Sequence, residues 1–153
     1  MNLEDFSIKV NELHPQIIKA LTQHEHNYLS RGQITLPQFW ALDYLYSNGK
    51  SKMNILAKHL KISPAATTGL IDRLITQNLV IRKNGLDDRR IVWIELTSKG
   101  RDVISDIKRQ KIHSLVKIFD RISPEDRKHY LNILEQLLKI TNSFTQGKHQ
   151  RQA

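Results

Sequence analysis

A chain of 153 residues with 39% hydrophobic residues is long enough to form one globular domain around a buried core. It contains no cysteine, which excludes a disulfide framework, a thiolate zinc site, a cysteine nucleophile and thiol-based redox sensing. The formal net charge is +9. Because the sequence has no apolar run of about 20 residues and no charged-then-apolar leader, we expect a soluble, cytoplasmic protein.

The positive charge is concentrated in the middle third of the chain. Residues 50–101 contain 11 basic and 4 acidic side chains, whereas residues 1–49 contain 3 and 5, and residues 102–153 contain 10 and 6. A polyanionic partner explains this distribution better than a basic face that only aids solubility.

The chain begins with a predicted long helix. Over residues 3–30, apolar side chains recur every three or four positions from Phe6 to Tyr28. Pro15 lies inside this span and predicts a kink or a split. Because the nearby chain is too short to cover the apolar stripe, we expect a partner subunit to cover it.

Two further helices precede the basic region. Thr35 and Gln38 have the spacing of a capping box for a mostly apolar, deeply buried helix, and Asn48-Gly49 predicts its end. A short amphipathic helix is then expected over about residues 53–60.

The next helix is predicted to begin at Ser63, a good N-cap, with Pro64 in the first helical position. One face is apolar and should be buried, with Leu70, Ile71 and Leu74. The opposite face is small and polar at the start and cationic further along, with Ala65, Thr67, Thr68 and Arg73. Two short helices joined by about three residues predict a helix-turn-helix, whose slender second helix could approach DNA closely.

A charged hairpin and two long helices complete the chain. Residues 79–82 and 91–96 are rich in β-branched side chains and predict two strands with a long, charged tip between them. Thr97 is expected to cap a long helix with an apolar stripe that runs from Ile104 to Ile122. Ser123, followed by a proline and two acids, predicts the start of another helix. The chain is polar from Thr145 and is expected to fray there.

The predicted fold is therefore mainly α with a small β-hairpin wing. A winged helix-turn-helix lobe is expected over residues 33–97, and a helical dimerisation region over residues 3–31 and 98–145.

This pattern resembles the MarR family of winged helix-turn-helix transcription regulators over nearly the whole chain. Residues 88–97 resemble that family's wing motif, an Asp-x-Arg followed by five residues and Leu-Thr. Residues 63–74 resemble its recognition helix, and residues 54–57 the helix before it. Lys61 and Asn78 stand where the family often has glycine. The resemblance implies a homodimer that binds a palindromic double-stranded DNA operator, usually as a repressor.

The recognition helix is expected to contact base edges through its first two turns, with Ser63, Pro64, Ala65, Thr67 and Thr68. Threonine offers a hydroxyl and a methyl group, and the methyl group suits thymine. Because these side chains include no arginine or asparagine for a bidentate base contact, we expect the shape of the DNA to supply more of the specificity.

Other residues are expected to contact the DNA backbone or to support the hairpin: Lys52, Asn54, Arg73 and Arg82. Arg89 and Arg90 are the candidates for the minor groove, because a narrow groove concentrates negative potential. The alternative is that they form an ordinary solvated hairpin tip. By resemblance, Asp88 would pair with a nearby arginine and fix the wing.

The resemblance also implies a small aromatic or anionic effector between the dimerisation helices and the DNA-binding lobe. His24, Tyr28 and Trp40 could line such a cavity, but we favour the alternative that they are core or interface aromatics.

No metal site or cofactor is predicted, although a metal-responsive regulator of the same fold is an alternative. His24 and His26 are two positions apart, so they point to different sides of a helix. His14 and His113 lie on other elements and could converge only in a dimer.

Enzymatic activity is not expected. Asp87 and Asp88 are adjacent on a hairpin and do not face each other across a cleft. The sequence has no phosphate-binding glycine loop, no nucleophile elbow and no helical histidine pair for zinc. A winged-helix module that binds only other proteins is a further alternative, but it would not need the basic central third.

Overall fold

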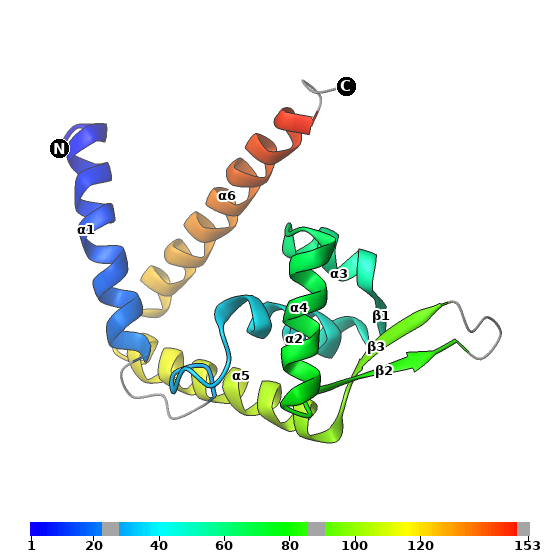
Figure 1. The fold of residues 1–153 in the computed structure, drawn as a ribbon. Helices are drawn as coiled ribbons and strands as arrows, with labels where there is room; N and C mark the ends of the chain where they lie inside the picture. The colour runs from blue at the N-terminus through cyan, green and yellow to red at the C-terminus, as the bar shows by residue number, and fades with distance from the viewer. Residues whose placement is uncertain (23–27, 86–90, 150–153) are drawn as a thin grey trace. The chain divides into compact units, whose positions relative to one another are not determined.

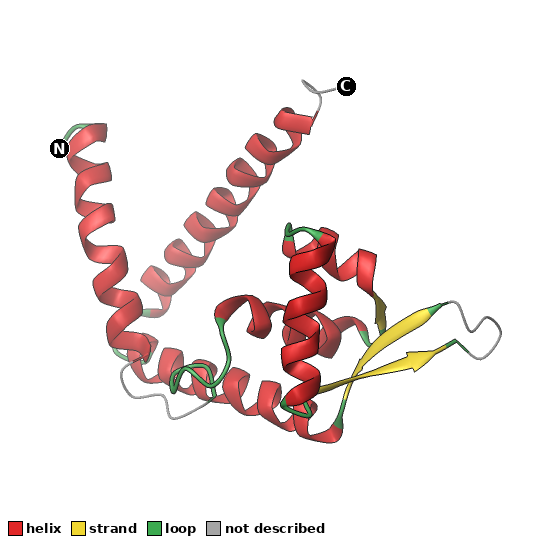
Figure 2. Ribbon diagram, viewed as in Figure 1, coloured by secondary structure: helices red, strands yellow, loops and turns green. Residues whose placement is uncertain are grey.

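The computed structural model describes residues 1–22, 28–85 and 91–149. The chain divides into two compact units, Met1–Ser114 and Leu115–Ala153. The helices and strands of the described residues follow one another as α1 (Leu3–Thr22), α2 (Leu36–Asn48), β1 (Ser51–Lys52), α3 (Met53–Leu60), α4 (Pro64–Thr76), β2 (Val80–Asn84), β3 (Val92–Leu96), α5 (Ser98–Phe119) and α6 (Pro124–His149) (Figure 1). The structure is mainly helical, with one small sheet (Figure 2), which confirms the predicted fold class.

Helix α1 is continuous from Leu3 to Thr22 with Pro15 in its interior, so the predicted split does not occur. An interior proline removes one backbone hydrogen bond, and the flanking turns here continue past it. The predicted extension to residue 30 is wrong, because residues 28–30 form a turn. The backbone N–H groups of Gln33 and Ile34 donate to the carbonyl of Tyr28 at 2.9 and 3.2 Å.

Helix α2 begins and ends as its sequence predicts. Gln38 Oε1 accepts from the backbone N–H of Thr35 at 2.8 Å, and Thr35 Oγ1 accepts from the backbone N–H of Gln38 at 3.4 Å, which completes the capping box. Gly49 ends the helix with a φ of 77°. The expected deep burial holds for only one face, because the Trp40 side chain is 46% exposed.

The sheet is antiparallel with the strand order β1-β3-β2. The predicted hairpin is present as β2 and β3, in which Val80 pairs with Leu96 and Asn84 with Val92. Strand β1 was not predicted, since two residues are too few to show a periodic pattern. It pairs Ser51 with Ile94 and Lys52 with Trp93, so it ties the start of α3 to the wing.

The hydrophobic core lies within the Met1–Ser114 unit and is formed by helices α2 to α5 and by the sheet. Its largest fully buried apolar side chains are Leu42, Leu45, Leu56, Ile71, Leu74, Leu79, Val80, Ile94, Ile104 and Ile107. Thr97 caps α5 as expected, because its Oγ1 accepts from the backbone N–H of Gly100 at 2.9 Å. A Cβ atom on Gly100 would lie 1.9 Å from the Leu79 carbonyl oxygen, so only glycine fits where α5 meets the sheet.

Helix α6 starts at the predicted position. Ser123 Oγ accepts from the backbone N–H of Asp126 at 3.1 Å. The helix continues to His149, beyond the fraying expected from Thr145. Helix α5 ends at Phe119, so Ile122 lies in the turn before α6 and not on the predicted helical stripe. In the described part of the chain, no helix is both long enough and apolar enough to cross a membrane.

Candidate DNA-binding site

Helix α4 is anchored by its cap and by its buried face. Ser63 Oγ accepts from the backbone N–H of Ala66 at 3.2 Å, and Pro64 occupies the first turn, as predicted. Leu70, Ile71 and Leu74 are buried, as expected from their spacing. Because this face is held in the core, the opposite face of α4 is fixed in a single exposed orientation.

The prediction that Thr67 faces a base edge is wrong. Its side chain is fully buried, and its Oγ1 donates to the carbonyl of Ser63 at 2.9 Å. Position 67 lies three, four and seven residues before the buried Leu70, Ile71 and Leu74, so helical periodicity assigns it to the core face. The bond to Ser63 satisfies its hydroxyl, which makes burial acceptable.

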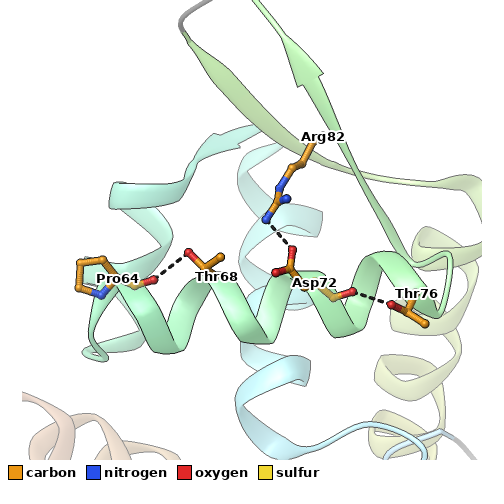
Figure 3. A network of polar contacts seen from close by, with 5 residues as sticks. All are labelled: Pro64, Thr68, Asp72, Thr76 and Arg82. Carbon is orange, nitrogen blue, oxygen red and sulfur yellow. Dashed lines mark hydrogen bonds and ion pairs between the residues drawn. The ribbon is translucent and has the colours of Figure 1, made fainter.

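The exposed face of α4 is slender near its N-terminus. The other side chains predicted to face base edges, Ser63, Pro64, Ala65 and Thr68, are exposed. Figure 3 shows that the side chains of Pro64, Thr68, Asp72 and Thr76 follow one another along the helix at intervals of four residues. Thr68 Oγ1 donates to the Pro64 carbonyl at 3.0 Å, so its lone pairs remain able to accept from a base. Gly69 also lies on the exposed side and has nothing within 4 Å of an added Cβ.

An ion pair connects this helix to the wing. Arg82 Nη2 on β2 donates to Asp72 Oδ1 on α4 at 2.6 Å (Figure 3). The side chains are 40% and 52% exposed, so the pair lies at the surface. Of the two roles predicted for Arg82, the geometry favours support of the hairpin over a phosphate contact. Asp72 was not identified in the sequence, although it is an isolated acid on an otherwise neutral or cationic helix.

The turns at both ends of α4 use left-handed residues other than glycine. Lys61, between α3 and α4, has φ 55° and ψ 38°, and Asn78, after α4, has φ 58°. These are the two positions where the resembled family often has glycine. The turn geometry is therefore kept, although a left-handed non-glycine residue costs about 1–2 kcal/mol.

The remaining predicted backbone contacts lie at the surface or at its edge. Asn54 and Arg73 are exposed, and Lys52 is half-buried at the N-cap of α3. Its ammonium group lies 5.4 Å from the centre of the Trp93 ring. Asp88, Arg89 and Arg90 lie outside the described residues.

Of the predicted effector residues, Tyr28 lines an open depression of about 450 Å³ together with Ser98, Lys99, Asp102, Val103 and Asp106. Trp40 does not line it, and His24 lies outside the described residues. The structure therefore does not bring Tyr28 and Trp40 together in this depression.

No group of three or more histidine or carboxylate side chains converges in residues 1–22, 28–85 and 91–149. His14 and His113 are exposed there, and His24 and His26 lie outside those ranges.

Comparison with known proteins agrees with this geometry. The model of the MarR family matches residues 34–92. The HTH-type transcriptional regulator YsmB of Bacillus subtilis (strain 168) is 30% identical over 110 residues, which cover 72% of this chain and 75% of YsmB. The HTH-type transcriptional repressor MdtR of the same organism is 33% identical over 67 residues, 44% of this chain and 43% of MdtR. A solved MarR family protein from Bacillus stearothermophilus has a TM-score of 0.73 and 27% identity, over 93% of this chain and 99% of that one.

The helix-turn-helix, the wing and these relatives define a DNA-binding transcriptional regulator, not an enzyme. The chain belongs to the MarR family.

Proposed function

We infer that the chain is a sequence-specific repressor that acts in the cytoplasm as a homodimer on a palindromic operator. Helix α4 of each copy enters the major groove, and the wing enters the adjacent minor groove. The observation that carries this proposal is the slender, exposed start of α4 on a helix whose other face is fixed in the core. A DNA-binding helix must reach base edges at the floor of a groove about 12 Å wide, and small side chains allow that approach.

Dimerisation is supported by the apolar faces of two helices. On α1 the exposed apolar side chains include Phe6, Val10, Leu13 and Ile17, and on α6 they include Leu131, Leu134, Leu138 and Phe144. Each of these helices exposes a row of large apolar side chains, and exposed apolar surface of this kind often marks a protein interface. A second copy is the partner that gives two recognition helices, and these would read half-sites about 34 Å apart.

Base recognition is expected to combine few direct contacts with DNA shape. Ala65 and Thr68 offer methyl groups for thymine, and Thr68 also offers a hydroxyl oxygen. Repression by blocking a promoter is supported by the likeness to MdtR, which is a transcriptional repressor.

Release by a small molecule is the second part of this proposal. The depression beside Tyr28 has a lysine and two carboxylates in its lining, so it suits an aromatic ligand better than a strongly anionic one. A thermal-shift screen with phenols and phenolic acids tests this part, and the expected result is a raised Tm together with release of the bound duplex. A screen without a hit would remove the effector and leave DNA binding in place.

The proposal as a whole is tested by selecting binding sites from a random duplex library, followed by sedimentation of the free protein. We expect a palindrome with half-sites about 10 base pairs apart and a dimer in solution. A failure to select any duplex would favour the protein-interaction module. Binding that chelator abolishes would instead favour the metal-responsive regulator.

The wing is tested on the selected duplex with Arg90→Ala. The affinity for DNA should fall by about 1–3 kcal/mol if this side chain enters the minor groove. Lys139→Ala, which removes the same charge from an exposed position on α6, is the control. Equal affinities of the Arg90→Ala variant and the control would remove Arg90 from the mechanism.

A further inference from the structure

The face of the sheet opposite α4 carries an aromatic ring surrounded by lysines. Side chains alternate between the two faces of a strand, and directly paired residues share a face. Ser51 and Ile94 are paired and buried, so the neighbouring row, Lys52, Trp93 and Lys83, lies on the outer face. Trp93 is half-buried there, at the centre of the row.

Two of the surrounding lysines are held against the tryptophan. The ammonium nitrogen of Lys50 lies 4.8 Å from the centre of the Trp93 ring, and that of Lys52 lies 5.4 Å from it. Both distances are within the range in which a ring attracts a cation. The ammonium groups of both lysines therefore lie against the same ring.

The third lysine of this face is paired with a carboxylate, whereas in the part of the chain that the structure describes the other two are not. Lys83 Nζ lies 2.7 Å from Glu95 Oε2. Among the described residues, no carboxylate pairs with Lys50 or Lys52. Within residues 1–22, 28–85 and 91–149, the outer face thus presents two cations that have a ring as their neighbour and no carboxylate partner, which suits an external anion.

We propose that Lys50 and Lys52 bind the phosphate backbone of the operator on the outer face of the wing sheet, and that Trp93 is the residue that positions them. This inference rests on the proposed function. The minor groove is about 6 Å wide, so a wing inside it has a phosphate strand on each of its two faces. Arg82 lies on the face toward α4, where it pairs with Asp72, and Lys50 and Lys52 meet the phosphate strand on the opposite face.

The proposed phosphate contacts of the two lysines are tested with the double variant Lys50→Ala/Lys52→Ala, which is titrated with the duplex selected for the parent protein. The plot of log affinity against log salt should become shallower by about 1.8 per bound chain, because about 0.9 is lost for each phosphate contact. Between about 50 mM and about 200 mM salt, the parent should therefore lose about 12-fold more affinity per bound chain than the variant. Lys128→Ala/Lys139→Ala on α6 removes the same charge and should leave the slope unchanged.

The positioning role is tested with Trp93→Leu and Trp93→Phe. The leucine variant keeps both lysines and should bind several-fold more weakly, whereas the phenylalanine variant should recover most of the affinity. Direct contact is tested by replacing the phosphates of the minor groove with neutral methylphosphonates. This replacement should weaken the parent but cause little further loss in the Lys50→Ala/Lys52→Ala variant.

Trp93 also provides a spectroscopic test. In a Trp40→Phe variant it is the only remaining tryptophan, since the chain has two. Iodide should quench its fluorescence strongly because the lysines attract the anion, and bound duplex should protect it. Two results would overturn this inference and leave the proposed function in place, provided that the parent protein binds DNA. One is an unchanged salt slope in the Lys50→Ala/Lys52→Ala variant, and the other is Trp93 fluorescence that iodide still quenches when the duplex is bound. If the parent protein selected no duplex from the library, both the proposed function and this inference would be refuted.

Discussion

The ion pair between Arg82 and Asp72 gives a prediction in which stability and DNA binding respond differently to the same change. Both side chains are substantially exposed, so the pair should contribute only about 0.2–1 kcal/mol to the free energy of unfolding. For a chain of this size, Arg82→Ala should lower the Tm by no more than about 4 °C.

The effect on DNA binding should be larger, because Arg82→Ala leaves an uncompensated carboxylate on the recognition helix. One unit of charge changes the slope of log affinity against log salt by about 0.9. This corresponds to a change of about 8-fold in the affinity for DNA per bound chain near 0.1 M salt. We therefore expect weaker binding for Arg82→Ala, tighter binding for Asp72→Asn, and near-parental binding for the double variant, in which the local charge is again balanced.

The assay is a titration of each variant with the selected duplex at several salt concentrations, with urea unfolding in parallel. If the double variant has the same slope as Arg82→Ala, Asp72 does not act through its charge and the reasoning is wrong. If Arg82→Ala instead lowers the free energy of unfolding by several kcal/mol, the ion pair stabilises the fold more than an exposed pair should.

Four further substitutions test the fold and the site. Gly100→Ala should destabilise the protein by about 3 kcal/mol or more in urea unfolding, because its Cβ would meet the Leu79 carbonyl. Gly69→Ala, the control in open space, should stabilise the fold by about 0.5–1 kcal/mol, and a loss of stability there would contradict the local geometry. Ser63→Ala should cost about 1 kcal/mol, and an unchanged Tm would show that the cap contributes nothing. Thr68→Ala should change the selected sequence but not the salt slope; a repeat of the site selection checks this, and an unchanged consensus would refute the base contact.

Much of the fold could be predicted because local chemistry determines it. The capping box at Thr35 and the N-caps at Ser63 and Ser123 each lie at the start of a helix. The hydrogen bonds that satisfy the first-turn N–H groups there involve neighbouring residues. The helical periodicity of α4 also identified its buried face. Applied strictly, the same periodicity would have assigned Thr67 to the core, but its polarity suggested the surface.

Other features depend on residues that are distant in sequence. Strand β1 exists because Ser51 and Lys52 pair with β3, and two residues carry no pattern of their own. The Asp72–Arg82 pair forms only when the wing packs beside the recognition helix, and this tertiary contact has no local sequence signal. The contacts of Lys50 and Lys52 with Trp93 could not be predicted for the same reason, since β1 brings these lysines beside a strand about forty residues later in the chain.

The left-handed residues at Lys61 and Asn78 have a consequence for engineering. Each occupies a conformation that glycine adopts without steric cost, and the two lie at opposite ends of the recognition helix, outside the stripe formed by Thr68, Asp72 and Thr76. Replacing either residue with glycine would therefore relieve strain and raise the thermal stability of the fold. The exposed face of α4 that is proposed to read the bases would stay unchanged in such a variant.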